Sequence, residues 1–128
     1  MDQMILNLVF FSKNNDPLNQ YSKLMNLFIE TCRIYNIKLI LMTQFNNLKN
    51  VNKIQYSKYN MFNEETRIIS KAKNIPLIDL DYLVPKNDEM MYDGLHLSDK
   101  GSLFVSDIIS NYLFKLYKNE RDFSISVD

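Results

Sequence analysis

The chain has 128 residues, enough for one domain with a real hydrophobic core. Lysine plus arginine equal aspartate plus glutamate at 15 each, which excludes the strong positive field that favours nucleic acid or an anionic membrane surface. Hydrophobic residues make up 46% of the chain, too many for a disordered protein. We therefore expect one globular domain with no nucleic-acid partner.

Further classes of protein are disfavoured by motifs that the sequence lacks. No apolar run approaches the roughly 18 residues that a membrane span needs, and the first residues lack the basic stretch of a secretory signal. We expect no membrane span and, by default, a cytoplasmic location. One histidine and scattered carboxylates give no metal-ligand spacing, and two glycines give no phosphate-binding loop. Neither a metal nor a cofactor is expected.

The first part of the chain predicts a strand, a helix and a second strand. Met4–Phe11 is apolar on both faces, as in a strand covered by helices on each side. Pro17 marks a helix entry, and apolar residues at every third or fourth position predict an amphipathic helix over 18–35. Cys32 lies on its apolar face and is expected in the core. Lys38–Thr43 is the second strand, so a right-handed parallel crossover follows.

The second part predicts two more helices and a third strand. Gln44–Phe62 is long for a loop, and we expect either a functional flap or a turn of helix within it. Asn63 with the two glutamates after it marks the start of a short helix. Pro76–Asp81 is the third strand. The last helix is expected over 99–117, followed by a polar tail over 119–128.

The element order βαβαβα predicts an α/β fold. We expect a three-layer α/β/α domain over residues 1–118, with a short parallel sheet between helices. In such sheets the functional residues lie in loops at the carboxyl ends of the strands. Two loops meet this condition: Ser12–Asp16 after the first strand and Tyr92–Gly101 after the third.

The loop Tyr92–Gly101 contains the only histidine of the chain, His96. Asp93 precedes it by three residues, and Asp93-Gly94 is a turn dipeptide that folds the carboxylate toward the imidazole Nδ1–H. Such a contact fixes the tautomer and leaves Nε2 as a base. Ser98 is expected to be the N-cap of the last helix. The residues also permit a plainer alternative, in which Asp93 only makes a turn and His96 only lies beside a helix start.

The run D-G-L-H-L-S-D-K-G, followed by an amphipathic helix, resembles the last sequence block of the SGNH (GDSL-type) hydrolases. The resemblance implies a Ser-His-Asp triad in which Asp93 orients His96, and His96 serves as general base and then as general acid. The implied fold is the second half of the flavodoxin-like SGNH domain. The implied substrates are carboxylic esters, including acetylated sugars and lipids.

The run K-N-N-D at Lys13–Asp16 resembles the G-x-N-D block of the same family, whose Asn donates to the oxyanion. The matching residue is Asn15. Losing one oxyanion donor costs roughly 3–4 kcal/mol in the barrier. The match is imperfect because Lys13 stands where the family has Gly. The alternative is that Asn15-Asp16 only makes an Asx turn ahead of Pro17.

The nucleophilic serine of the family lies in a G-D-S block, which this sequence does not contain. Gly94 and Gly101 are its only glycines, so no G-x-S-x-G elbow replaces that block. Ser12 is the nearest serine in sequence, but it occupies the loop of Asn15. Two hypotheses remain. The chain is an SGNH-type ester hydrolase domain, truncated at its N-terminus, whose serine comes from elsewhere, or it is an inactive α/β module with a binding or assembly role.

The missing first blocks also affect the expected sheet. In the family's strand order, the absent first strand lies beside the strand that is Met4–Phe11 here. An apolar strand left at an edge favours pairing with another polypeptide. We therefore expect self-association, or pairing with a chain that carries the lost half, through Met4–Phe11.

Overall fold

The computed structural model describes residues 16–49 and 52–125, without the side chains of residues 119–125. The expected strand Met4–Phe11 lies outside these residues. The described part is mostly helical, with one two-stranded sheet. Its elements are, in order, α2 (Pro17–Ile34), β1 (Leu41–Met42), α3 (Lys53–Lys73), β2 (Leu77–Ile78), α4 (Leu80–Leu83) and α5 (Asp99–Ile125).

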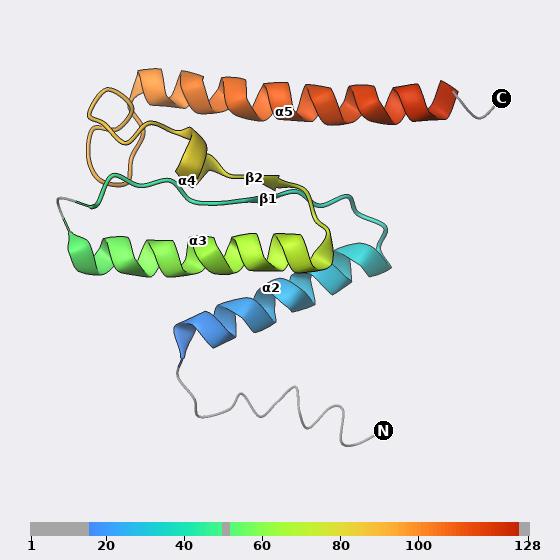
Figure 1. Ribbon diagram of the computed structural model, residues 1–128, viewed down its shortest axis with the longest axis horizontal. Coiled ribbons are helices and arrows are strands. Elements are labelled where there is room, and N and C mark those ends of the chain that lie inside the picture. Colours follow the sequence, from blue (N-terminus) through green and yellow to red (C-terminus); the bar gives the residue numbers. More distant parts are fainter. Residues whose placement is uncertain (1–15, 50–51, 126–128) are drawn as a thin grey trace.

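The sheet confirms the parallel pairing that the sequence predicts for the second and third strands. Leu41 of β1 lies opposite Leu77 of β2, and Met42 lies opposite Ile78. Figure 1 shows α5 along one side of the strand pair, and α3 with α2 on the other side. The mixed α/β class is therefore correct. The described residues do not confirm a complete three-layer α/β/α domain, because they supply two strands rather than three.

Leu77 and Ile78, successive residues of β2, point into two separate hydrophobic cores, as the pleat of a strand requires. Leu41 packs with Ile29 of α2 and Ile69 of α3, all at most 5% exposed. Ile78 packs on the other face, in a cluster that includes Val105 of α5. Each such aliphatic side chain contributes roughly 1.5–3 kcal/mol when it is fully buried. These two cores attach the helices to the strand pair.

Both strands are shorter than predicted. Only Leu41–Met42 of the segment 38–43 and Leu77–Ile78 of the segment 76–81 are strand. The chain turns immediately after β2 because the Asp79 side chain accepts the backbone N–H of Tyr82 and caps α4. The residues Leu80 and Asp81, predicted as strand, are therefore helical.

The helix predicted to start at Asn63 begins at Lys53, with Asn52 as its N-cap. The segment 44–62 thus contains a helix, one of the two expected alternatives. Asn63 is 3% exposed and caps no helix. Its Oδ1 accepts the N–H of Gln44 at 2.9 Å, and its Nδ2 donates to the Gln44 carbonyl at 2.7 Å. The Asn63 side-chain amide therefore makes, with the backbone of Gln44 after β1, the two hydrogen bonds that a neighbouring strand would make.

The ends of the other helices agree more closely with the sequence. Asp16 caps α2, accepting the N–H of Leu18 at 3.1 Å, and Cys32 is buried as predicted. Helix α5 starts at Asp99 as predicted but continues to Ile125, into the segment expected to be a polar tail. Within the described ranges, none of the helices is both long and apolar enough to cross a membrane.

Candidate acid–base site

The structure brings Asp93 and His96 together. His96 Nδ1 lies 2.8 Å from Asp93 Oδ2. Asp93 is a carboxylate at neutral pH and can only accept, so the proton of this hydrogen bond belongs to Nδ1. The neutral imidazole then carries its free lone pair on Nε2, which is the tautomer that a general base requires.

The Asp93 carboxylate is itself held by the backbone. Its Oδ1 accepts the N–H of Leu95 at 2.7 Å and the N–H of His96 at 2.8 Å. The Leu95 N–H, the His96 side chain and the His96 N–H, in that order, lower the pKa of Asp93 from 3.8 to about 2. Asp93 therefore stays ionised throughout the pH range in which an imidazole titrates.

The turn that carries the pair is closed by a short antiparallel pairing. Met91 and Leu97 form an isolated bridge. On either side of it, Tyr92 N–H donates to the His96 carbonyl at 3.1 Å and Ser98 N–H donates to the Met90 carbonyl at 2.9 Å. The ends of the turn are thus fixed by the backbone, and Asp93 and His96 keep their spacing.

The turn is joined directly to α5. Ser98 is the N-cap predicted from the sequence, since its Oγ accepts the N–H of Gly101 at 3.0 Å. The Ser98 hydroxyl also donates to the Glu89 carbonyl. Gly101 has no side chain at the point where the Met90 carbonyl passes over the first turn of α5, and a Cβ there would collide with it. Glycine is therefore required by close packing of backbone on backbone.

A second support comes from the loop after β1. Asn47 N–H donates to the Gly94 carbonyl at 2.9 Å. Leu48, which is 4% exposed, covers Gly94 so closely that a Cβ on Gly94 would overlap its Cδ2. The loop after β1 thus contacts and supports the middle of the Asp93–His96 turn. Neither Asn47 nor Leu48 carries a sequence signal for this contact, which only the structure shows.

The pair is open to solvent. The side chain of His96 is 71% exposed and that of Asp93 is 54% exposed. Among the described residues, no group is hydrogen-bonded to His96 Nε2. The arrangement can therefore take a proton from, or return one to, a group that approaches from outside.

Two residues that the resemblance implicates cannot be placed relative to this pair. Asn15, the expected oxyanion donor, and Ser12 both lie outside the described residues. Of the described serines, Ser98 is closest to His96 in sequence, but its hydroxyl is committed to the Glu89 carbonyl and the helix cap. Ser98 therefore acts as a structural residue.

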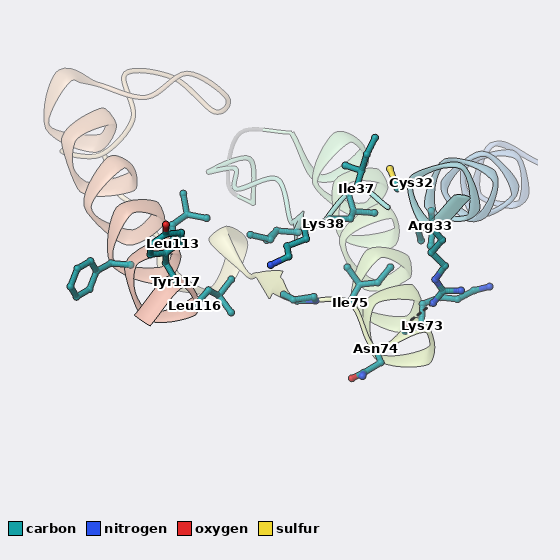
Figure 2. Close-up of a pocket in the computed structure, with 15 residues that line it drawn as sticks. Cys32, Arg33, Ile37, Lys38, Lys73, Asn74, Ile75, Leu113, Leu116 and Tyr117 are labelled. Carbon is teal, nitrogen blue, oxygen red and sulfur yellow. Dashed lines mark hydrogen bonds between the residues drawn. The ribbon is translucent and has the colours of Figure 1, made fainter. Parts of the chain in front are cut away.

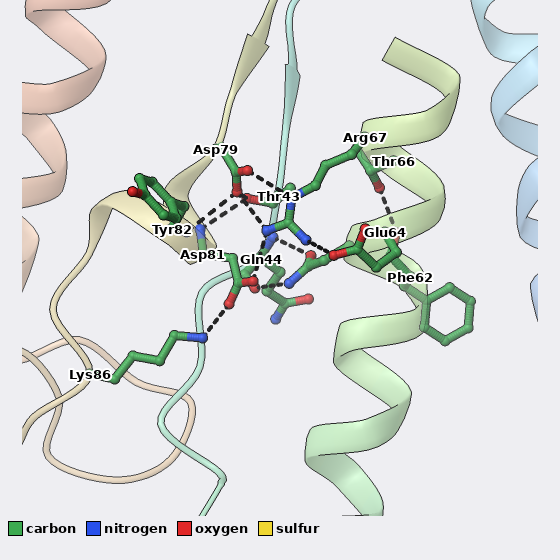
Figure 3. Close-up of polar contacts among 11 residues, drawn as sticks. Thr43, Gln44, Phe62, Glu64, Thr66, Arg67, Asp79, Asp81, Tyr82 and Lys86 are labelled. Carbon is green, nitrogen blue, oxygen red and sulfur yellow. Dashed lines mark hydrogen bonds and ion pairs between the residues drawn. The ribbon is translucent and has the colours of Figure 1, made fainter. Parts of the chain in front are cut away.

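A charged network lies behind the carboxyl ends of both strands (Figure 3). Arg67 of α3 grips Asp79 with two bonds, Nε to Oδ2 at 2.7 Å and an η-nitrogen to Oδ1 at 2.8 Å, and bonds Asp81 at 2.9 Å. Thr43 Oγ1 donates to Asp79 at 2.7 Å and accepts the Asp81 N–H at 2.9 Å. Asp81 also pairs with Lys86. The network ties α3 to the ends of β1 and β2.

The electrostatics of this network are those of a structural clamp. The Arg67 guanidinium lowers the pKa of Asp79, and Asp79 in turn raises the pKa of Arg67. Both carboxylates accept from cationic side chains, Asp79 from Arg67 and Asp81 from Arg67 and Lys86. The sequence predicts Asp79 and Asp81 as strand residues and does not predict this role. A pair of acids at a strand end, with an arginine one helix earlier, was the available signal.

Asn46, in the loop after β1, is fully buried. Its Oδ1 accepts the Leu48 N–H at 3.4 Å, whereas its Nδ2 has no hydrogen-bond partner. A buried unpaired donor costs roughly 1–3 kcal/mol.

A cavity of about 740 Å³ lies at the amino ends of the two strands, at the other end of the strand pair from the Asp93–His96 turn (Figure 2). Residues 37–40 before β1 and 74–76 before β2 line it, together with the C-terminal parts of α2 and α5. It therefore opens beside the amino ends of the strands, whereas the Asp93–His96 turn rests on the loop after β1. This cavity does not belong to the acid–base site.

Comparison of the chain with protein-family models, with curated proteins and with solved structures finds no match. We therefore infer the function from the residues and their geometry.

Proposed function

We propose that this chain carries the acid–base part of an SGNH-type hydrolase that acts on carboxylic esters. The observation that carries the proposal is the 2.8 Å contact between His96 Nδ1 and Asp93 Oδ2, with the same carboxylate held by two backbone N–H groups. A histidine that only lies beside a helix start requires no such support. The proposed complete fold is the three-layer α/β/α domain of that family.

Each residue has a separate part in the proposed reaction. Asp93 holds the imidazole in the Nδ1–H tautomer and stabilises the imidazolium that forms. His96 takes the proton of the attacking hydroxyl at Nε2 and then returns it to the leaving alcohol. Asn15 donates to the oxygen of the ester carbonyl as that atom becomes negative. The attacking serine is not evident in this chain and is supplied from elsewhere.

The alternative is a catalytically inactive α/β module with a binding or assembly role. The engagement of Ser98 in the helix cap favours it, because this removes the described serine nearest to His96 in sequence. In this alternative, the Asp93–His96 contact only fastens the turn to α5.

Turnover of p-nitrophenyl acetate by the purified chain tests the proposal. An oriented imidazole can activate water even without a serine, and general base catalysis contributes about 10²–10⁴ in a complete site. We expect His96→Ala to reduce hydrolysis by about tenfold or more. Asp93→Asn should cause a comparable loss, because Asp93 fixes the tautomer that leaves His96 Nε2 free to act as the base.

The matched control is Asp107→Asn, which alters an exposed aspartate on α5, away from the turn. It should leave the rate unchanged. The proposal is wrong if wild type, His96→Ala and Asp93→Asn hydrolyse the ester at the same rate, and the inactive module then stands. A loss in His96→Ala without a loss in Asp93→Asn would indicate a simple exposed imidazole.

A further inference from the structure

The strand β1 has one open edge. Its bonds to β2 use the N–H groups of Leu41 and Thr43, which donate at 2.9 and 3.2 Å to carbonyls of the segment 76–78. Successive N–H groups of a strand point to opposite edges, so those of Ile40 and Met42 point away from β2. Among the described residues, none accepts a hydrogen bond from either group. An edge of this kind is a template for a further strand.

Helices flank this edge on both faces of the sheet. The 740 Å³ cavity, which Ile40 helps to line, separates Leu113 of α5 from Cys32 at the end of α2 (Figure 2). Its walls are mainly apolar, and they are open to water, since Leu113 is 46% exposed and Ile37 is 57% exposed. Met42, farther along the same edge, is 51% exposed. The cavity and the open edge of β1 together form what we call the edge groove.

The edge groove fits a polypeptide better than a small apolar ligand. A hydrocarbon ligand could cover the apolar walls, but it would leave the N–H groups of Ile40 and Met42 without an acceptor. An extended peptide offers carbonyls to these groups and, because its side chains alternate, apolar groups to both walls at once. The occupant should therefore be an extended segment that is apolar on both faces.

Met4–Phe11 has this composition and a matching length. It is apolar on both faces, and its eight residues span about 26 Å as a strand. Helix α2, with 18 residues, is about 27 Å long, and its last residues lie at the cavity. Only residues 12–15 separate Met4–Phe11 from Asp16, the N-cap of α2. A strand that starts at the cavity and runs parallel to β1 would therefore end near the start of α2.

We propose that the edge groove is the docking site of Met4–Phe11 of the same chain, which pairs in parallel with β1 between α2 and α5. Helix α2 then forms the crossover between the two strands, with the right-handed sense that such connections have. The 740 Å³ cavity becomes part of the hydrophobic core and is not a ligand site. One edge of Met4–Phe11 is used within the chain, so only its other edge is left for a partner. This inference is independent of the proposed ester hydrolysis.

Amide hydrogen exchange of the full chain, followed by NMR, tests the proposal. We expect the N–H groups of Ile40 and Met42 to exchange about a hundredfold more slowly than in an unstructured chain, or slower still. Leu8→Asp and Val9→Asp place a charge on opposite faces of the docked segment. Because both faces are buried in the edge groove, each change should remove most of this protection. The control Gln3→Asp adds the same charge just outside the segment and should leave the protection intact.

The N–H groups of Leu41 and Thr43 show whether the variants still fold. They bond β2, so they should stay protected in Leu8→Asp and Val9→Asp. If a variant does not fold, the wild type decides alone, because rapid exchange at Ile40 and Met42 overturns the proposal. Protection that survives both changes would overturn it as well.

Two further measurements on the wild type exclude other occupants. Anilinonaphthalene sulfonate, a fluorescent probe of exposed apolar surface, should bind Leu8→Asp and Val9→Asp but not the wild type. Binding to the wild type that is lost in Leu113→Asp would show that the cavity is open to ligands. Light scattering gives the mass in solution. Protection of Ile40 and Met42 that disappears when a dimer is diluted would assign the edge groove to a second copy. Either result would overturn docking within the chain.

Discussion

Asp93 contacts His96 twice, through the imidazole Nδ1 at 2.8 Å and through the backbone N–H of His96 at 2.8 Å. One carboxylate thus fixes both the position and the tautomer of the base. The backbone bond fixes only the turn, so the orientation of the imidazole ring depends on its Nδ1–H bond to the ionised Asp93 carboxylate. This orientation should be lost when Asp93 is protonated in acid.

The first prediction concerns the pH of that protonation. The pKa of Asp93 is lowered from 3.8 to about 2, chiefly by the Leu95 N–H. The folded state therefore binds fewer protons than the unfolded state between these two values, so the stabilisation from Asp93 is complete above pH 3.8 and is lost as the pH falls through about 2. Titration of the Asp93 carboxyl carbon by NMR should give a midpoint near 2. A midpoint near the ordinary value would show that the backbone bonds do not persist in solution.

The second prediction concerns the tautomer. In Asp93→Asn, the side-chain oxygen can still accept the backbone N–H groups of Leu95 and His96, which turns the amide NH₂ toward His96 Nδ1. Two donors cannot face each other, so the proton moves to Nε2. The ¹⁵N shifts of the imidazole should show Nδ1–H in the wild type and Nε2–H in the variant. The same tautomer in both proteins would contradict the assigned hydrogen bond.

The third prediction concerns the seat of the turn. Ala at position 94 would overlap Leu48 Cδ2, which is the flexible end of a side chain, so Gly94→Ala should destabilise the fold by about 1–2 kcal/mol. Leu48→Ala alone should cost about 2–4 kcal/mol, because Leu48 is buried. The double variant should be more stable than the sum of the two changes predicts. Urea unfolding of the four proteins measures the coupling, and simple additivity would contradict the contact.

The fourth prediction separates packing from helix propensity at Gly101. Propensity alone predicts that Gly101→Ala stabilises α5 by roughly 1 kcal/mol. The structure predicts the opposite, a loss of about 3 kcal/mol or more, because the new Cβ would collide with the Met90 carbonyl and backbone cannot move aside easily. Ser102→Ala, on the exposed side of the same turn, is the control and should be neutral or slightly stabilising. Thermal unfolding distinguishes the two outcomes by their sign.

The acid–base turn could be predicted from the sequence because its determinants are local. The Asp93-Gly94 dipeptide and the Ser98 cap act within a few residues, and the structure has both. What holds the turn in place could not be predicted. The contacts of Asn47 and Leu48 with Gly94 cross from one loop to another, and no periodicity in either segment indicates which loop faces which.

The start of α3 shows how local signals can mislead. Asn63 and the two glutamates after it match the sequence pattern of a helix N-terminus, but the Asn63 side-chain amide bonds the backbone of Gln44 instead. The real cap, Asn52, precedes a lysine- and tyrosine-rich segment that looks like a loop. Tertiary contacts hold this part of α3, including the edge-on packing of Phe62 against Tyr21 of α2. Such contacts outweigh composition.

The last prediction concerns the clamp behind the strands. Arg67→Met would leave Asp79 and Asp81 without their shared cation, and their side chains are only 27% and 10% exposed. We expect a loss of about 2–3 kcal/mol at pH 7, since hydrogen bonds to charged groups are the stronger ones. The control Arg33→Met breaks an ion pair with Glu30 whose side chains are about half exposed, and it should cost at most about 1 kcal/mol.

The pH dependence of these variants gives the clamp a second test. Because Arg67 is the main cause of the lowered pKa of Asp79, the wild type gains stability above pH 3.8 and loses it as the pH falls below that value. Arg67→Met should lose less stability than the wild type over the same acid range, whereas Arg33→Met should follow the wild type there apart from any smaller effect of Glu30. Chemical denaturation at pH 7 and pH 3 measures both. If the wild type and Arg67→Met lose equal stability between pH 7 and pH 3, groups other than Arg67 lower the pKa of Asp79. The Thr43 hydroxyl would then be the next group to replace.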